Sequence, residues 1–241
     1  MLRAEGLCLG ARLADVVLDL RAGEAVAVLG PNGAGKSTLL SALAGLRELD
    51  AGRIQWKGQE LSHIPFLERG RTLAWLGQES PADFAFPVRE VVAQGRHAWG
   101  DDGRGVEAAM AALDITHLAA RPITELSGGE RRRVFLARAL ATGAPVQLWD
   151  EPASALDVRH ALEVYALARK LASEGHALLV SLHDIRAAYR FSRALVLDRG
   201  RLVADGEPHA VLTADLLRSV FRIEARFVTS LVPELPEPPC A

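Results

Sequence analysis

A glycine-rich stretch near the amino end, GPNGAGKST at residues 30–38, constrains the fold of this chain more than any other feature. It follows a short, almost continuously apolar run at 24–29, which is typical of a strand buried on both faces, and it precedes a predicted helix over 36–46. Residues 30–37 match G-x-x-x-x-G-K-[ST] in full, a spacing that lets backbone N–H groups surround phosphate oxygens. Because a chance match occurs in about one in a hundred chains of this size, the stretch predicts a phosphate-binding loop.

The residues of this loop have distinct expected tasks around a bound nucleotide. Gly30, Gly33 and Gly35 permit the tight turn that brings the backbone close to phosphate. Lys36 is expected to reach the β and γ phosphates of ATP, and the Ser37 hydroxyl to ligate Mg²⁺. ATP and Mg²⁺ are therefore the predicted cofactors. The nucleotide-binding segment comprises Gly30, Pro31, Asn32, Gly33, Ala34, Gly35, Lys36, Ser37 and Thr38.

An apolar run that ends in two carboxylates supplies the second part of a hydrolytic site. VQLWDE, residues 146–151, predicts a buried strand whose end carries Asp150 and Glu151. In isolation, adjacent carboxylates at a strand end are more often a solvated turn. Beside a phosphate loop, we expect Asp150 to hold Mg²⁺ through water and Glu151 to polarise the attacking water.

Predicted strands and helices alternate over much of the chain, which indicates a parallel sheet covered by helices on both faces. Residues 2–20 favour one or two antiparallel strands, residues 53–58 a further strand, and residues 88–140 mostly helix. The predicted fold class is α/β, with a P-loop NTPase (RecA-like) core, an antiparallel β subdomain and an inserted α-helical subdomain. Strands of the core are expected at 72–78, 146–150, 176–182 and 193–200, and helices at 158–174 and 184–191.

Length and composition set the domain count and the broad class. The 241 residues suffice for a single domain over 1–230, with its helical subdomain at about 79–140, and the proline-rich tail at 231–241 is expected to be disordered. A formal net charge of −2 argues against non-specific nucleic-acid binding, so no nucleic-acid partner is predicted. We find no charged leader and no apolar run near the roughly 18–20 residues of a membrane helix, which favours a cytosolic protein.

A second glycine-containing motif begins another predicted helix. LSGGE, residues 126–130, precedes a long amphipathic segment. Ser127, Gly128 and Gly129 therefore lie at a helix start, where N–H groups and the helix dipole favour anions. Taken alone, this tripeptide is more often an N-cap serine followed by two glycines.

The motifs GPNGAGKST, LSGGE and VQLWDEP, in this order and spacing, resemble those of the nucleotide-binding subunits of ATP-binding cassette transporters. The resemblance covers residues 1 to about 225. In that family two subunits hold two ATP molecules between them, head to tail. It implies a homodimer in the ATP-bound state, in which Ser127, Gly128 and Gly129 of one subunit contact the γ-phosphate held by the other. SALD, residues 154–157, resembles the family's loop that crosses this interface.

Two more residues take roles from the same resemblance. Gln78, at the end of its predicted strand, looks like the family's glutamine that senses Mg²⁺ and water and links to the membrane subunit. His183 resembles the switch histidine that contacts the γ-phosphate, although outside this family a lone histidine after a strand is more often structural. The expected catalytic residues are Glu151, His183 and Gln78, and the expected metal ligands are Ser37, Asp150 and Gln78.

The chain departs from the family pattern in two places. The family often stacks an aromatic residue on adenine, whereas Leu9, Gly10, Ala11 and Arg12 occupy that neighbourhood here, so the planar guanidinium of Arg12 is the available substitute. The family's signature is commonly followed by E-x-Q-R, and here Arg132 replaces the glutamine. The arginine run at 131–133 is otherwise predicted to form a solvated helix face.

The resemblance extends to a narrower class of transporter. Residues 84–99 and 183–213 resemble the corresponding regions of importers for iron–siderophore complexes, haem and vitamin B12. This predicts an ATP-hydrolysing subunit of an importer for a metal chelate or corrinoid. It would work with a separate membrane-spanning permease, and indirectly with a substrate-binding protein, at the cytoplasmic face of the inner (plasma) membrane.

Three other functions are compatible with part of the pattern. An ATPase subunit of an ABC exporter is the closest of these alternatives. A soluble ABC ATPase acting on DNA or ribosomes usually carries two cassettes or a long coiled-coil insertion, and the sequence has neither. A small-molecule P-loop kinase would explain the phosphate loop but would leave LSGGE and His183 without a purpose.

Overall fold

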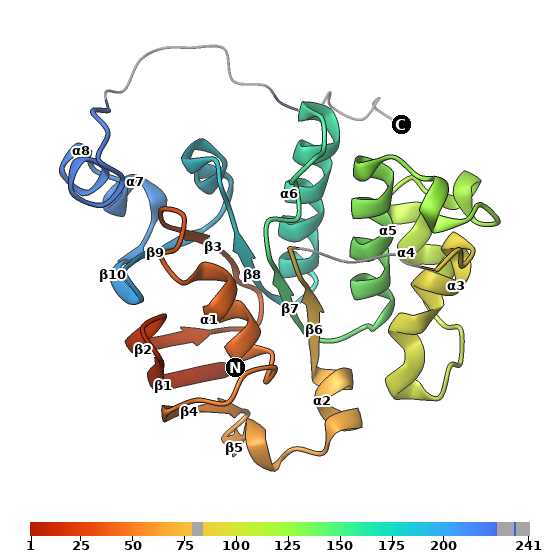
Figure 1. The fold of residues 1–241 in the computed structure, drawn as a ribbon, viewed down its shortest axis with the longest axis horizontal. Coiled ribbons are helices and arrows are strands. Elements are labelled where there is room, and N and C mark those ends of the chain that lie inside the picture. Colours follow the sequence, from red (N-terminus) through yellow and green to blue (C-terminus); the bar gives the residue numbers. More distant parts are fainter. Residues whose placement is uncertain (79–83, 226–233, 235–241) are drawn as a thin grey trace.

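The computed structural model describes residues 1–78, 84–225 and 234 (Figure 1). The predicted tail at 231–241 lies outside the described residues apart from Glu234, as do the first five residues of the predicted helical subdomain, 79–83. None of the helices in the described part of the chain combines the length and the apolar character that a membrane span requires.

Six strands form the central sheet, in the order β10-β9-β3-β8-β7-β6 (Figure 1). The first five in the chain are parallel, as the alternation of strands and helices predicts, and β10 pairs antiparallel with β9 at one edge. β10 was not predicted from the sequence. The strands are β3 (Ala25–Leu29), β6 (Leu73–Leu76), β7 (Val146–Trp149), β8 (Ala177–Ser181), β9 (Arg193–Asp198) and β10 (Arg201–Gly206).

The central sheet is covered on both faces, which explains the continuous apolar runs of its inner strands. β3, β7 and β8 are buried along their whole length. Successive side chains of a strand point to opposite faces, so β3 contributes to two cores. Val26 and Val28 belong to one core, and Ala25, Ala27 and Leu29 belong to the other.

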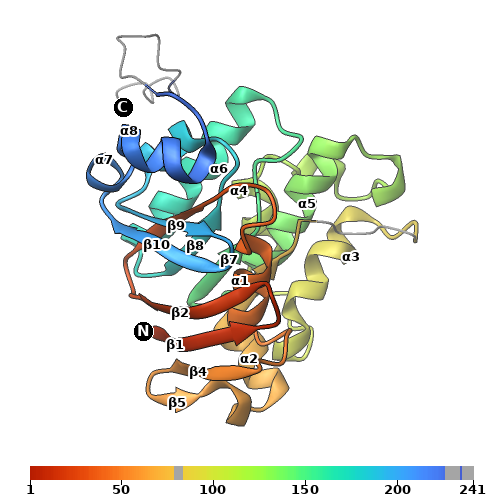
Figure 2. The same cartoon turned by 60° about the vertical axis from the view of Figure 1, so that its left-hand side comes forward.

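The first of these cores lies between the central sheet and a smaller antiparallel sheet of order β2-β1-β4-β5. The helix α1 (Lys36–Leu43) contributes buried leucines to the same core. Figure 2 shows the smaller sheet at the opposite end of the molecule from α7 (Pro208–Val211) and α8 (Ala214–Leu216). The predicted antiparallel subdomain is thus present, formed by β1 (Leu2–Leu9), β2 (Leu13–Leu20), β4 (Ala51–Trp56) and β5 (Gln59–Glu60).

The other face of the central sheet carries the longer helices. The helix α6 (Val158–Ser173) supplies Val164, Ala168 and Ala172 to the second core, and its position matches the predicted helix at 158–174. The predicted helix at 184–191 is instead a 3₁₀ helix over 185–190. The short helix α2 (Phe66–Thr72) leads into β6 and was not predicted.

The helical subdomain lies beside the β6 edge of the central sheet (Figure 1). Its helices α3 (Val88–Ala93) and α4 (Val106–Ala112) pack against α5 (Gly128–Ala141). The predicted helical stretch is divided near Gly100 and Gly105, whose φ values of 79° and 74° are left-handed. The remaining turns are 3₁₀ helices at 61–63, 94–99, 116–118 and 123–125, and a π-helical turn at 217–221.

Candidate active site

The phosphate loop joins the buried end of β3 to the start of α1, and two of its glycines are required by neighbouring backbone. Gly30 has a φ of 153°, and a Cβ atom there would lie 2.4 Å from the carbonyl oxygen of Leu197 in β9. Gly35 has a φ of 106°, and its Cβ would lie 2.6 Å from the carbonyl oxygen of Arg12. The shape of the loop is therefore fixed by the strands and turns around it.

Lys36 is the first residue of α1, and its side chain turns back into the loop. It is buried, and its Nζ donates to the carbonyl oxygens of Gly30 (2.7 Å) and Pro31 (3.3 Å). Burial lowers the pKa of Lys36, and the nearby carboxylates of Glu151 and Asp150 oppose that shift. Phosphate oxygens are stronger acceptors than neutral carbonyls, so this ammonium can exchange its partners for an anionic ligand.

One serine of the adjacent strand contacts both residues that follow β7. Asp150 is 1% exposed, and its Oδ1 accepts a hydrogen bond from Ser181 Oγ at the end of β8. The same Ser181 Oγ accepts from the backbone N–H of Glu151 at 2.8 Å. Ser181 was not predicted as a site residue, because its only signal in the sequence is a single hydroxyl in an otherwise apolar run.

Glu151 has an uncommon backbone conformation and a side-chain partner from another strand. Its φ is 48°, in the left-handed region that few residues other than glycine adopt. Its Oε2 accepts a hydrogen bond of 3.2 Å from Nε2 of Gln78, which follows β6. The loops after two neighbouring parallel strands thus bring Gln78 and Glu151 together.

One pocket of about 380 Å³ gathers most of the predicted site. It extends along the phosphate loop and is closed by residues that follow three different strands. Arg12, which occupies the expected aromatic position, also lines it. The lining residues are Arg12, Asn32, Gly33, Ala34, Gly35, Lys36, Ser37, Thr38, Gln78, Glu151 and His183.

The LSGGE residues line a different pocket of about 490 Å³, which shares no residue with the first. Ser127 is the N-cap of α5 and forms a capping box with Glu130. The Ser127 hydroxyl donates to Glu130 Oε2 at 2.7 Å, and its backbone N–H donates to the same atom at 2.8 Å. These bonds lower the pKa of Glu130. Ser127, Gly128 and Gly129 line this pocket together with residues 155–157.

The predicted solvated face at residues 131–133 is wrong for Arg132. Its side chain is 6% exposed and reaches from α5 to the two loops that carry Gln78 and Glu151. Burial lowers the pKa of the guanidinium to about 10, so it stays protonated at neutral pH. Arg131 and Arg133 are half-buried. Three successive helical positions differ by about 100° in direction, so they cannot share one environment.

Comparison with known proteins relates this arrangement to a family. The family model described as ABC transporter matches residues 13–154, more than half of the chain. The chain is 47% identical over 237 residues to the hemin import ATP-binding protein HmuV of Nocardia farcinica, covering 92% of this chain and 82% of that protein. It is 42% identical to the cobalamin import ATP-binding protein BtuD of Halobacterium salinarum, over 87% of this chain and 54% of that protein.

A solved structure supports the same relationship. An ABC transporter assigned to the metal-chelate type, in an inward-facing conformation, aligns with a TM-score of 0.77 at 30% sequence identity. The alignment covers 92% of this chain and 89% of that one. The α/β fold class predicted from the sequence is therefore confirmed.

Proposed function

The chain belongs to the ABC transporter family as one of its ATP-hydrolysing subunits, and we propose that it energises the import of haem or of a related metal chelate or corrinoid. The similarity to HmuV over 92% of the chain carries this proposal. The names of the relatives refer to hemin and to cobalamin, which are both metal-centred tetrapyrrole-type macrocycles. The transported compound is inferred from these relatives, because the pocket on this chain is built for phosphate.

In the proposed reaction a water molecule attacks the γ-phosphorus of ATP, and the bond to the β–γ bridging oxygen breaks to give ADP and inorganic phosphate. Glu151 orients the water, and its hydrogen bond to Gln78 keeps the carboxylate at the edge of the pocket. Lys36 and the N–H groups of the loop stabilise phosphate charge, and His183 contacts the γ-phosphate. Phosphoryl transfer depends on positioning and electrostatics, which is what these residues supply.

The donor set also suits Mg²⁺. Ser37 and Asp150, with Gln78, would hold it by hard oxygen atoms. Mg²⁺ is usually bound by one or two carboxylates together with substrate phosphates and water. Residues 1–78 and 84–225 contain no cluster of three or more His, Cys, Asp or Glu side chains that could hold a metal ion. When bound, Mg²⁺ neutralises charge that develops on the β and γ phosphates.

We further propose that two copies complete each other's sites in the ATP-bound state. The start of α5 is the positive end of a 14-residue helix, and Ser127, Gly128 and Gly129 stand there, in a pocket separate from the phosphate loop of the same chain. In a head-to-tail homodimer these three residues would meet the γ-phosphate held by the other subunit. The neighbouring residues 154–157 would then lie in the interface.

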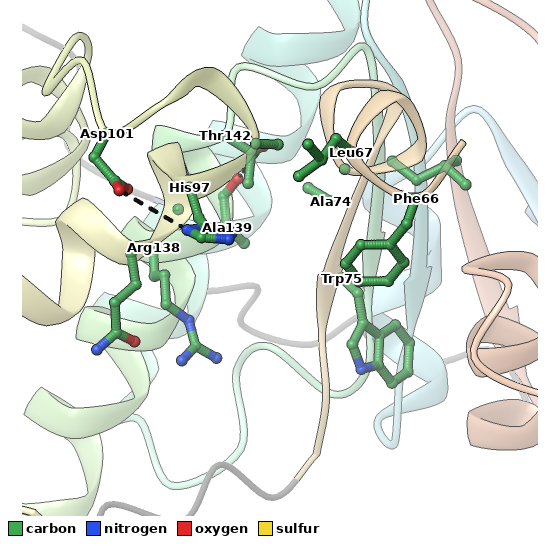
Figure 3. Close-up of a pocket in the computed structure, with 14 residues that line it drawn as sticks. Phe66, Leu67, Ala74, Trp75, His97, Asp101, Arg138, Ala139 and Thr142 are labelled. Carbon is green, nitrogen blue, oxygen red and sulfur yellow. Dashed lines mark hydrogen bonds and ion pairs between the residues drawn. The ribbon is translucent and has the colours of Figure 1, made fainter. Parts of the chain in front are cut away.

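The partner permease has a candidate docking groove of about 630 Å³ between α2 and the helical subdomain. Figure 3 shows Phe66 and Leu67 on one side of it and His97, Arg138 and Ala139 on the other. Phe66 is 72% exposed and Leu67 is 50% exposed, so two adjacent apolar side chains face solvent at this groove. A short amphipathic helix of a separate membrane-spanning subunit would cover them and place this chain at the cytoplasmic face of the inner membrane.

Transport in reconstituted vesicles tests the proposal. The full chain would be incorporated with the permease it captures from its own membranes, and ATP-dependent movement of haem, cobalamin and a ferric siderophore would be measured. We expect substrate to move toward the side of the membrane that carries this chain. Vesicles that enclose the chain together with ATP should therefore take up external substrate, and vesicles that carry the chain outside should release preloaded substrate when ATP is added outside. Movement of substrate away from the ATPase side would identify an exporter and contradict the proposal.

A further inference from the structure

Arg132 connects three parts of the site that the proposed mechanism treats separately. We infer that Arg132 is a positioning residue, which fixes the loops carrying Gln78 and Glu151 relative to each other and to the helix that begins at Ser127. This inference rests on the proposed hydrolysis of ATP. It assigns a task to a residue that no motif singled out for catalysis.

The guanidinium contacts backbone carbonyl groups on both loops. Its Nη1 donates to the carbonyl oxygens of Gly77 (2.6 Å) and Gln78 (3.1 Å). Its Nη2 donates to the carbonyl oxygens of Asp150 and of Glu151, the latter at 2.9 Å. The planar fork of an arginine can serve two such pairs at once, whereas the single ammonium of a lysine cannot reproduce that geometry.

These four carbonyl groups lie just beyond the last hydrogen bond between β6 and β7. The N–H of Asp150 still donates to the carbonyl oxygen of Leu76 at 2.8 Å, and beyond this bond β6 and β7 separate into loops. Glu151 then adopts its left-handed conformation, which costs on the order of 1–3 kcal/mol and persists only where the surroundings enforce it. Ser181 holds the N–H of Glu151, and Arg132 holds its carbonyl oxygen.

Burial of this charge is difficult to explain by stability alone. Within residues 1–78 and 84–225, no carboxylate forms an ion pair with Arg132, although those of Asp150 and Glu151 are near enough to favour its protonated form. A buried cation is costly unless its donors are satisfied. Here neutral carbonyls accept from Nη1 and Nη2, whereas the buried Nε–H has no partner among the described residues. All four belong to the two loops that present Gln78 and Glu151.

The position of Arg132 on α5 adds a link to the other half-site. Ser127 caps this helix, and Arg132 lies five residues later, about 7 Å along the axis. A helix moves as a unit over this distance because its backbone is hydrogen-bonded throughout. A displacement of Ser127 that accompanies contact with the partner's nucleotide would therefore be transmitted through Arg132 to Glu151.

Two variants of the full chain test this inference, and a third serves as a matched control. Arg132→Met removes the donors and keeps an unbranched buried side chain, and Arg132→Lys keeps the charge. We expect kcat for ATP hydrolysis to fall about 10- to 100-fold in Arg132→Met, with partial recovery in Arg132→Lys and with the Kd for ATP changed less than about twofold. Arg96→Met is the control, because Arg96 is also buried and donates to two carbonyl groups near the other end of α5, away from both loops.

Arg96→Met is expected to lower the thermal midpoint but to keep the wild-type kcat. Wild-type kcat in folded Arg132→Met would overturn the inference, as would an equal loss of kcat in the control. If Arg132→Met does not fold, Arg132→Lys decides by the same criterion. Introducing Arg132→Met into Glu151→Gln is expected to cause little further loss in single-turnover rate, because Arg132 acts through Glu151. A wild-type chain without ATPase activity would instead contradict the proposed function itself.

Discussion

The phosphate loop and the LSGGE segment are both glycine-containing helix starts, but their glycines have different reasons to be there. Gly30 and Gly35 are required by this chain, since a Cβ at either would collide with backbone oxygen at 2.4 or 2.6 Å. Gly128 is helical, and a Cβ there would meet only the Ala155 side chain at an ordinary 3.9 Å. The fold would accept a larger residue at Gly128. In the proposed dimer, Gly128 would leave room for the nucleotide held by the partner subunit.

The largest expected effect concerns the phosphate loop, which should still bind ATP when hydrolysis is blocked. Glu151→Gln removes the carboxylate that is proposed to orient water and keeps an amide of the same shape beside Gln78. We expect kcat to fall about 10²- to 10⁴-fold with the Kd for ATP little changed. Steady-state hydrolysis and nucleotide titration measure the two quantities. Unchanged turnover would remove Glu151 from the mechanism.

Gly128→Ala tests the LSGGE side. We expect hydrolysis to fall about 10- to 100-fold, because a methyl group would displace the partner's γ-phosphate from the start of α5. The free energy of unfolding should stay level or rise by up to about 1 kcal/mol, as for other replacements of glycine in helices. A variant with normal turnover would show that nothing approaches this glycine closely.

Mixed dimers sharpen the same test. Combining Ser127→Arg subunits with Lys36→Ala subunits should restore one complete composite site, whereas each variant alone has none. Restored ATP-dependent dimerisation in the mixture supports the head-to-tail arrangement. Dimerisation no better than that of the separate variants would contradict it.

Unlike Gly128→Ala, Gly30→Ala is predicted to lower the stability of the fold. The added Cβ would press against the carbonyl oxygen of Leu197, so β9 or the loop must shift. We expect a loss of about 1–3 kcal/mol in the free energy of unfolding, together with loss of ATP binding. Denaturant titration beside Gly128→Ala makes the comparison direct. Equal stability of the two variants would break the distinction between the two kinds of glycine.

The smallest effect concerns the capping box at the LSGGE helix. Hydrogen bonds from the Ser127 hydroxyl and N–H lower the pKa of Glu130 from 4.5 in the folded chain. The associated stability is present above about pH 4.5 and is lost as the pH falls through the lower folded pKa. Glu130→Gln should cost about 0.5 kcal/mol at neutral pH and flatten this acidic dependence. An unfolding curve with the wild-type dependence on pH would contradict the assignment.

The site could be predicted from the sequence wherever adjacent residues cooperate. In the phosphate loop a strand, a turn and a helix start are contiguous, so the spacing of Gly30, Gly35 and Lys36 already specifies a local geometry. Arg132 was mispredicted because its partners are far away in the sequence, with Gly77 preceding it by 55 residues. The run of three arginines contains no local signal for which of them faces the sheet.

The fold was predictable to a similar degree and for the same reason. Buried parallel strands such as β8 have continuous apolar runs that identify them directly. The edge strand β10 has alternating exposed and half-buried residues, and only the turn at Arg199 and Gly200, with φ values of 45° and 76°, returns it against β9. Its existence depends on pairing across that turn, and local composition does not specify such pairing.

The helix α5 has a consequence for how ATP hydrolysis and substrate transport would be coupled. Ser127 caps its start, and Arg132 contacts the loops that carry Gln78 and Glu151. Near its far end, Arg138 and Ala139 line the groove proposed for the permease. Its 14 residues span about 21 Å, and a hydrogen-bonded rod of this length does not shorten. The partner's nucleotide and the permease would thus contact opposite ends of the same rigid helix. ATP hydrolysis without any movement of the permease would then require α5 to bend.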